Sequence, residues 1–96
     1  MFAWDPAKAA SNRVKHDVSF EEAMTVFADP DALDWTDPVH SIGEPRAKRL
    51  GKSSRGRILL VVYTVRLTKH ESETIRIISA RQASRKERAA YARPQD

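Results

Sequence analysis

The sequence predicts an α+β domain in which N-terminal helices and one C-terminal helix pack on a small antiparallel sheet. Apolar residues follow helical spacing in the first third of the chain and alternate with period two from about residue 33 to residue 80. Sequences typical of helix starts lie on both sides of this alternating region. The links between the alternating segments are too short for helical crossovers, which favours antiparallel pairing. The expected order of elements is (β)ααββββα.

The first two elements are predicted from alternation and from a helix-capping pair. Residues 2–4 alternate like a short strand. Asp5 followed by Pro6 suits the N-cap and the first position of a helix, which we expect over residues 6–16. The most apolar stripe of this helix comprises Ala7, Ala10 and Val14.

A second helix is expected to begin after Ser19. Ser19 and Glu22 have the spacing of a capping box, in which each side chain binds the other residue's backbone N–H group. Apolar residues at helical spacing follow, namely Phe20, Ala23, Met24 and Phe27. The pair Asp29-Pro30 is expected to end the helix.

Four strands and a final helix are expected next. The predicted strands are 33–36, 46–52, 57–67 and 73–80. Residues 53–56 form the turn between the second and third of them, and 57–67 is apolar on both faces, which is typical of a central strand. Ser84 and Glu87 predict a second capping box, at the start of a terminal helix that fades near Pro94.

Size and composition indicate one soluble intracellular domain over residues 1–96. The chain has no cysteine, which excludes disulfides and cysteine zinc sites and fits a reducing cytoplasm. The first residues lack the basic start and apolar run of a signal peptide. The longest apolar stretch, residues 58–65, is far shorter than the roughly 20 residues that cross a bilayer. We therefore expect a cytoplasmic protein with no membrane contact.

Charge is strongly segregated along the chain. The net charge is −5 over residues 1–42 and +9 over residues 43–96, although the whole chain carries only +4. A concentrated basic face on so small a domain attracts polyanions. Nucleic acid is the commonest polyanionic partner, so the charge pattern favours a nucleic-acid-binding protein.

The residues that could carry chemistry are mainly cations on regular structure. Three glycines cannot form a phosphate-binding loop, and three histidines far apart lack metal-ligand spacing, so we expect no metal and no cofactor. Arginine binds phosphate oxygens in a bidentate way and stays charged at any working pH. Each cation alone is better explained as a solvated surface residue. As a group they indicate phosphate binding, because the cations at positions 81 to 88 have only Glu87 among them, and Glu87 is expected to cap the terminal helix. The candidates are Arg46, Lys48, Arg49, Arg76, Arg81, Arg85, Lys86 and Arg88.

One histidine and two tryptophans are further candidates beside these cations. His40 lies in an expected loop shortly before Glu44 and Arg46, and a histidine can carry protons near neutral pH, although loop histidines are more often merely exposed. Trp4 and Trp35 could stack on bases, but in a chain with few large apolar residues we expect them in the core.

Motifs along nearly the whole chain resemble the BrnT family of toxins. The opening residues 2–8 are followed by Asn12, by Lys15-His16, and by residues 18–23 and 27–30 in the family pattern. The middle continues it with Asp37-Pro38, His40-Ser41, Gly43-Glu44, Arg46 and residues 50–53. The strongest part is the close, residues 75–81 and 83–88 with Tyr91. One departure is Lys48, at a position that is usually apolar in the family, so the strand that carries it is expected to be more exposed or shifted in register.

The resemblance implies the toxin of a bacterial type II toxin–antitoxin pair with a RelE-like ribonuclease fold. Such toxins cut RNA without a metal ion and arrest growth. A DNA-binding antitoxin of the BrnA type neutralises them, and the complex represses its own operon, so that operator DNA is contacted only through the complex. This fold agrees with the element order derived from the periodicity.

The resemblance and the cations together give a mechanistic hypothesis. The RNA 2′-hydroxyl would attack the adjacent phosphorus while Arg46 and Arg81 bind the non-bridging oxygens. His40, with Glu44, would transfer protons. The flanking backbone would be held by Lys48, Arg49, Arg76, Arg85, Lys86 and Arg88. Two alternatives use the same basic face: a non-catalytic nucleic-acid- or ribosome-binding module, and a protein that binds only an acidic protein partner.

Overall fold

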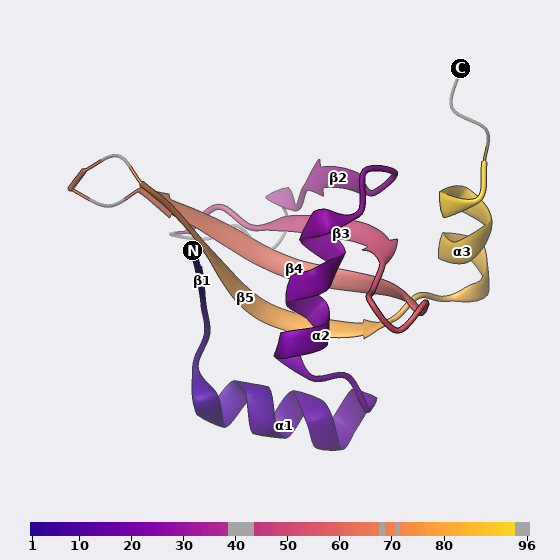
Figure 1. The fold of residues 1–96 in the computed structure, drawn as a ribbon, viewed down its shortest axis with the longest axis horizontal. Helices are drawn as coiled ribbons and strands as arrows, with labels where there is room; N and C mark the ends of the chain where they lie inside the picture. The colour runs from indigo at the N-terminus through magenta and orange to yellow at the C-terminus, as the bar shows by residue number, and fades with distance from the viewer. Residues whose placement is uncertain (39–43, 68, 71, 94–96) are drawn as a thin grey trace.

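The computed structural model contains a five-stranded sheet with three α-helices, and it describes residues 1–38, 44–67, 69–70 and 72–93 (Figure 1). The order of elements agrees with the prediction, and the α+β class is confirmed. In chain order they are β1 (Phe2–Ala3), α1 (Pro6–His16), α2 (Phe20–Thr25), the 3₁₀ helix η1 (Val26–Ala28), β2 (Leu33–Thr36), β3 (Ala47–Lys52), β4 (Ile58–Leu67), β5 (Glu73–Gln82) and α3 (Arg85–Tyr91).

The sheet is mixed, whereas the sequence predicted antiparallel pairing throughout. Its strand order is β1-β5-β4-β3-β2, with β4 in the middle as its two apolar faces predicted. Strands β2 to β5 pair antiparallel, as their short links require. Strand β1 instead runs parallel to β5. It pairs with the last strand and not with its successor in sequence, so no short turn constrains its direction.

Helix α1 has the predicted bounds, but it turns a different face to the sheet. The carboxylate of Asp5 caps it by accepting a hydrogen bond from the N–H of Ala7 at 2.8 Å. The predicted apolar stripe points to solvent, and Val14 is 90% exposed. The buried residue of this helix is Asn12. Its side-chain nitrogen donates to the carbonyl oxygen of Ala80 at 2.8 Å, and its side-chain oxygen accepts from the N–H of Ala80 at 3.1 Å.

The reason for this inward asparagine lies in β5. Strand β1 covers the edge of β5 only at Ile75 and Arg76, so the backbone of Ala80 has no neighbouring strand on that side. Buried backbone N–H and C=O groups need partners, and an amide side chain supplies both a donor and an acceptor. The hydrogen bonds of Asn12 to the backbone of Ala80 therefore determine which face of α1 is buried, and the apolar stripe does not.

Helix α2 begins at the predicted cap, but only half of the predicted capping box forms. The Ser19 hydroxyl accepts from the N–H of Glu22 at 3.0 Å. The Glu22 carboxylate does not return to the cap. It is buried and accepts hydrogen bonds from Ser53 and Arg57 of the β3–β4 turn.

The main core lies between one face of the sheet and helices α1 and α2. Its buried members are Val18, Phe20, Ala23, Val26, Leu59, Val61, Ile77 and Ala80. Trp4 packs edge-on against Phe20 with the ring centroids 6.0 Å apart, as expected for a core tryptophan. This core fixes the position of both helices on the same side of the sheet.

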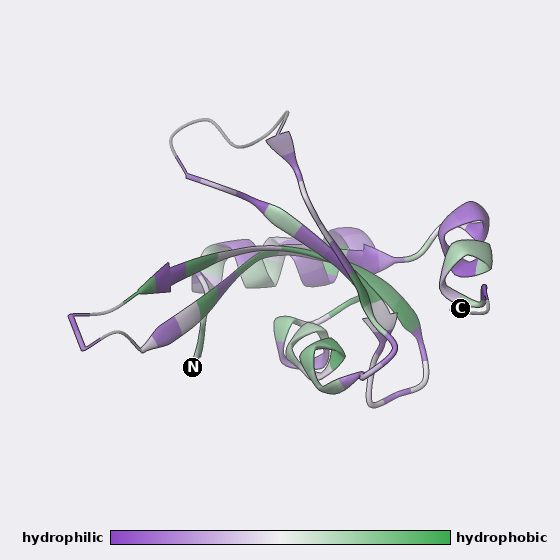
Figure 2. Ribbon diagram, turned by 90° about the horizontal axis from the view of Figure 1, so that it is seen from above, coloured by the Kyte–Doolittle hydropathy of each residue, from purple (hydrophilic) through white to green (hydrophobic). Residues whose placement is uncertain are grey.

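A smaller cluster lies on the opposite face, near α3. Leu50, Leu60 and Ala83 are its buried members. Helix α3 has no buried residue and approaches the cluster through the partly buried Tyr91, whose hydroxyl donates to the carboxylate of Asp29 at 2.6 Å. Figure 2 shows α3 standing at one end of the sheet, apart from α1 and α2. Within the part of the chain that the structure describes, no helix is long and apolar enough to cross a membrane.

Candidate nucleic-acid interface

We use the term open face for the side of the sheet opposite α1 and α2. Residues on it are identified by strand alternation, starting from Leu50 and Leu60 of the smaller cluster. Alternation along β3 places Lys48 and then Arg46 on the same side as Leu50. Arg81 of β5 pairs directly with Leu60 and therefore shares this face.

Three of the cross-strand rows on the open face carry the candidate residues. A bulge between Val62 and Tyr63 shifts the register, so that Arg76 comes to the same face as Arg81. Arg46 directly precedes β3, and its carbonyl oxygen accepts from the N–H of Asp37 at 2.9 Å, which continues the ladder by one step. The rows are Arg46–Thr64–Arg76, Trp35–Lys48–Val62–Ser79 and Leu33–Leu50–Leu60–Arg81.

Four of the predicted cations therefore share one face, but they are spread across it. Arg46 and Arg81 lie two strands apart, about 10 Å, and four residues apart along the strands, about 13 Å. The sequence predicted that such groups converge on a single phosphate. The register places the two arginines on either side of the Lys48 row, so that their side chains must extend toward each other to bind one phosphate.

Arg49 is not part of this group. Its position on β3 turns it to the helix side, where its Nε donates to the carbonyl oxygen of Val26 at 3.1 Å and its Nη1 lies 2.6 Å from the Asp34 carboxylate. Its guanidinium also lies over the Phe27 ring, 5.2 Å from the centroid. We therefore assign Arg49 to holding η1 and β2 together and remove it from the predicted RNA-binding residues.

Arg81 has a carboxylate partner that the sequence analysis assigned elsewhere. Its Nη1 and Nη2 atoms lie 2.7 and 3.0 Å from the two carboxylate oxygens of Glu87. Glu87 also accepts from the N–H of Ser84 at 2.8 Å, so the predicted capping box and the ion pair coexist. The hydrogen bonds from Arg81 lower the pKa of Glu87 to about 2. Arg81 thus holds a bidentate anion in the geometry that a phosphate would use.

Replacing Glu87 with glutamine tests the weight of this pair. Because the pKa of Glu87 is about 2 in the folded chain and near 4.5 when unfolded, the pair stabilises the fold fully above about pH 4.5. That stabilisation is lost as the pH falls from 4.5 through 2. Arg81 is 41% exposed, so solvent screening leaves about 1 kcal/mol at pH 7. Urea unfolding at pH 7 and pH 2 should show a Glu87→Gln deficit at pH 7 alone. Glu21→Gln controls for the loss of an exposed carboxylate, and an equal deficit at both pH values would contradict the ion pair.

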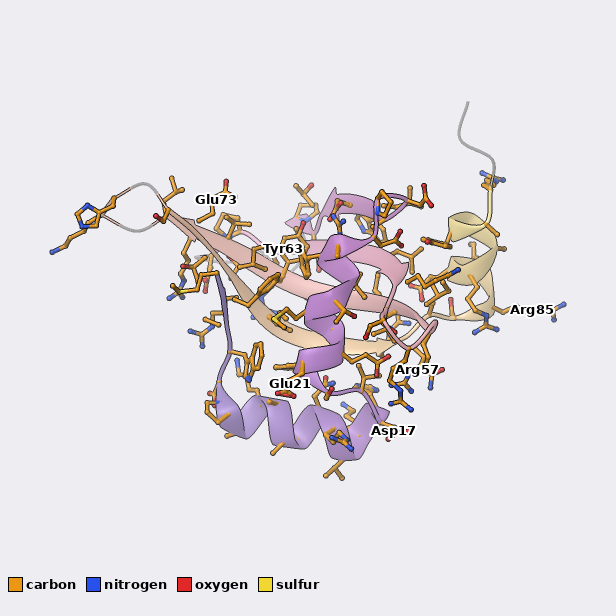
Figure 3. All side chains as sticks on the ribbon, viewed as in Figure 1. Asp17, Glu21, Arg57, Tyr63, Glu73 and Arg85 are labelled. Carbon is orange, nitrogen blue, oxygen red and sulfur yellow. The ribbon has the colours of Figure 1, made fainter. Side chains whose placement is uncertain are left out.

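The cations of α3 extend the basic surface beyond the Arg81 row. Arg85, Lys86 and Arg88 are all exposed on this helix, which begins three residues after the end of β5. Arg88 donates to the carbonyl oxygen of Ala83 at 2.8 Å. Figure 3 shows Arg85 pointing away from the sheet into solvent.

At the opposite end of the open face, Glu44 lies among cations. Its carboxylate is 2.8 Å from an Nη atom of Arg66, whose hydrogen bond holds the pKa of Glu44 below its usual value, and the charge of Arg76 acts in the same direction. Glu44 is therefore ionised at neutral pH. The other predicted proton carrier, His40, lies outside the described residues.

Trp35 is the residue of this face that the sequence analysis misplaced. Trp35 was expected in the core, but it lies on the open face and is 42% exposed. Leu33, two residues earlier on the same strand, packs against the smaller cluster, and Trp35 lies one row beyond it. No pattern in the sequence indicates this exposure, because it depends on β2 lying at the edge of the sheet.

Comparisons with known proteins point to one family. A family model described as "Ribonuclease toxin, BrnT, of type II toxin-antitoxin system" matches residues 4–87. Among solved structures, the 1.1 Å crystal structure of the Brucella abortus ribonuclease toxin BrnT superposes with a TM-score of 0.65 at 23% sequence identity. The match covers 88% of this chain and 99% of that one, and it shows a shared fold. Comparison with curated proteins gives no match.

Proposed function

The chain belongs to the BrnT family of ribonuclease toxins of type II toxin–antitoxin systems, and from this premise we propose that it is a metal-independent endoribonuclease. The observation that carries the proposal is the open face, on which Arg46, Lys48, Arg76 and Arg81 come from two different strands and their flanks to one surface. We take residues 1–96 as one toxin domain.

In the proposed reaction the RNA strand supplies its own nucleophile. The 2′-oxygen forms a bond to the adjacent phosphorus as the bond from phosphorus to the 5′-oxygen breaks, which leaves a cyclic phosphate and a 5′-hydroxyl. Negative charge grows on the non-bridging oxygens, where Arg46 and Arg81 would stabilise it. Arg81 would exchange the Glu87 carboxylate for phosphate oxygens, because the planar carboxylate and the tetrahedral phosphate can each accept two hydrogen bonds from one guanidinium.

Both proton transfers are assigned to His40, with Glu44 in a supporting role. An imidazole titrates near neutral pH, so His40 can take the proton of the 2′-hydroxyl and return one to the leaving oxygen. Glu44 is held ionised by Arg66, which suits it to stabilise a charged imidazole and makes it a weak proton acceptor. Lys48, Arg76 and the α3 cations would hold the flanking backbone.

The second half of the proposed function is control by an antitoxin. A basic open face with exposed cations on α3 is complementary to an acidic protein segment, which would cover the same surface as RNA. We propose that a DNA-binding antitoxin of the BrnA type neutralises the toxin in this way. The complex would bind operator DNA and repress its own operon.

Purified protein is expected to cut single-stranded RNA in the presence of EDTA. Because the nucleophile is the 2′-hydroxyl, a DNA strand of the same sequence should stay intact, and the RNA products should carry cyclic phosphate and 5′-hydroxyl ends. Adding the antitoxin should stop cleavage, and the complex should retard operator DNA that toxin alone does not. Product ends are read by mass spectrometry.

The result that would overturn the enzyme assignment is binding of RNA without cleavage, which identifies a non-catalytic nucleic-acid- or ribosome-binding module. Cleavage that disappears with EDTA would instead overturn metal independence. Protein carrying Arg81→Ala serves as the blank for contaminating nucleases, since any cleavage that both preparations share does not come from the proposed site.

A further inference from the structure

We propose that Trp35 stacks on an unpaired base of the bound RNA and makes the open face selective for single-stranded RNA. This stacking role rests on the ribonuclease function proposed above. It adds a base-contacting residue to a face on which the arginines and lysine contact only phosphates.

The first observation is the exposure of the indole. In the parts of the chain that the structure describes, the exposed large apolar residues are Met1, Val14, Trp35, Val65 and Leu67. Trp35 is the aromatic member of this set. The other tryptophan, Trp4, packs against Phe20 on the far side of the sheet. Burying an indole contributes more than burying most side chains, so an exposed one lacks a structural explanation here.

The second observation is its position among the cations. Trp35 pairs directly with Lys48 across β2 and β3. Cross-strand partners have Cβ atoms about 5 Å apart, so the two side chains leave the sheet next to each other. The Lys48 ammonium lies 3.8 Å from the Asp37 carboxylate. The row that contains both lies between the Arg46 row and the Arg81 row. Trp35 therefore lies at the β2 edge of the face that a strand between these arginines crosses.

The third observation concerns the strand that carries Trp35. Strand β2 is an edge of the sheet, and Leu33 on the same face packs against the smaller cluster while Trp35 lies beyond it. The indole therefore has a backbone fixed by the sheet, and the residue is 42% exposed. Aromatic rings interleaved with cations are how proteins bind single strands, because every base offers a face for stacking while the cations follow the backbone.

These features favour single-stranded over duplex RNA. In a duplex the base faces are covered by neighbouring base pairs, and the edges that remain are not presented to a side chain above the sheet. Stacking on Trp35 needs a base turned out of such a helix or one that was never paired. The open face should accordingly bind unpaired segments and discriminate weakly among base identities.

The test measures binding separately from cleavage. The probe is a single-stranded oligonucleotide with 2′-O-methyl groups, which cannot be cut because the nucleophile is blocked. Binding is followed by anisotropy of a label on the oligonucleotide. Trp35→Ala and Trp35→Thr should each weaken binding about 5- to 100-fold, and Thr is included because it suits a strand. Trp35→Tyr should recover most of the affinity.

Val14→Ala is the matched control, because it removes an exposed apolar side chain on the opposite side of the sheet. It should bind the probe like the unaltered protein. A duplex of the same sequence should bind more weakly than the single strand and equally to all variants. Quenching of tryptophan fluorescence by the probe should disappear in Trp35→Tyr, where Trp4 is the remaining indole.

Two outcomes separate failure of this inference from failure of the enzyme assignment. If the unaltered protein cuts RNA and folded Trp35→Ala binds the probe equally well, the stacking role is wrong and the exposed indole is left for a protein partner. If the unaltered protein neither binds nor cuts RNA, the proposed function and the stacking role both fail.

Discussion

Replacing Glu22 with alanine should lower the free energy of unfolding by about 3 kcal/mol. The Glu22 side chain is 5% exposed. Its carboxylate accepts from the Ser53 hydroxyl at 2.7 Å and from Arg57 Nε at 2.9 Å, and the other carboxylate oxygen pairs with Arg57 Nη2. These contacts tie the start of α2 to the β3–β4 turn.

The size of the loss follows from what the exchange leaves behind. Without Glu22, the guanidinium of Arg57 retains one hydrogen bond, to the carbonyl oxygen of Asp17 at 3.0 Å, and Figure 3 shows these two residues near each other at this turn. Its side chain is 20% exposed, so water reaches part of the charge. Removing one partner of a buried pair typically costs about 3–5 kcal/mol, and this partial exposure places the present case at the lower end.

Urea unfolding at pH 7 of the unaltered protein, Glu22→Ala and Glu21→Ala measures the effect. Glu21 is the adjacent carboxylate and is exposed, and its loss should cost about 0.5 kcal/mol or less. The Arg57 hydrogen bond lowers the pKa of Glu22, so the Glu22→Ala deficit should shrink as the pH falls below about 4.5. Equal losses in the two variants would show that the buried pair is not a stabilising tie.

The elements of this fold could be predicted from the sequence because they depend on local patterns. The caps at Asp5, Ser19 and Ser84 and the alternation of β4 each act within a few residues. What escaped prediction depends on pairing between distant segments. The parallel direction of β1, the inward turn of Asn12 and the place of Glu22 all follow from neighbours more than 30 residues away.

The candidate site shows the same division. Strand alternation was enough to place Lys48 on a predicted strand and Arg81 just past another, but the face of each residue depends on register. Arg49 is one residue after Lys48 on β3 and therefore faces the helix side of the sheet. The bulge in β5 brings Arg76 to the open face. The exposure of Trp35 depends on β2 being an edge strand, which a list of strands does not reveal.

Arg46→Ala and Arg81→Ala are each expected to lower the rate of RNA cleavage by about 10²- to 10³-fold and to relieve growth arrest on expression. In the proposed mechanism, each exchange removes a guanidinium that stabilises charge developing on the phosphate in the transition state. The loss should appear mainly in kcat, because that charge is greater in the transition state than in bound RNA. Single-turnover cleavage of a labelled RNA measures it.

The control for both variants is Arg13→Ala, which removes one positive charge from α1 on the helix side of the sheet. It should retain full cleavage and toxicity, which separates a local role from a change in net charge. Arg81→Lys keeps the charge but loses the bidentate fork, so its rate should lie between those of the unaltered protein and Arg81→Ala.

Stability must be checked before these rates are interpreted. Arg81→Ala breaks a partly exposed pair with Glu87, which should cost about 1 kcal/mol and leave the fold intact. Unfolding curves measured alongside the rates therefore distinguish lost chemistry from lost structure. If folded Arg46→Ala and Arg81→Ala both cut RNA as fast as Arg13→Ala, the open face is not where the phosphate reacts. The α3 cations and the helix side of the sheet would then be the next surfaces to test.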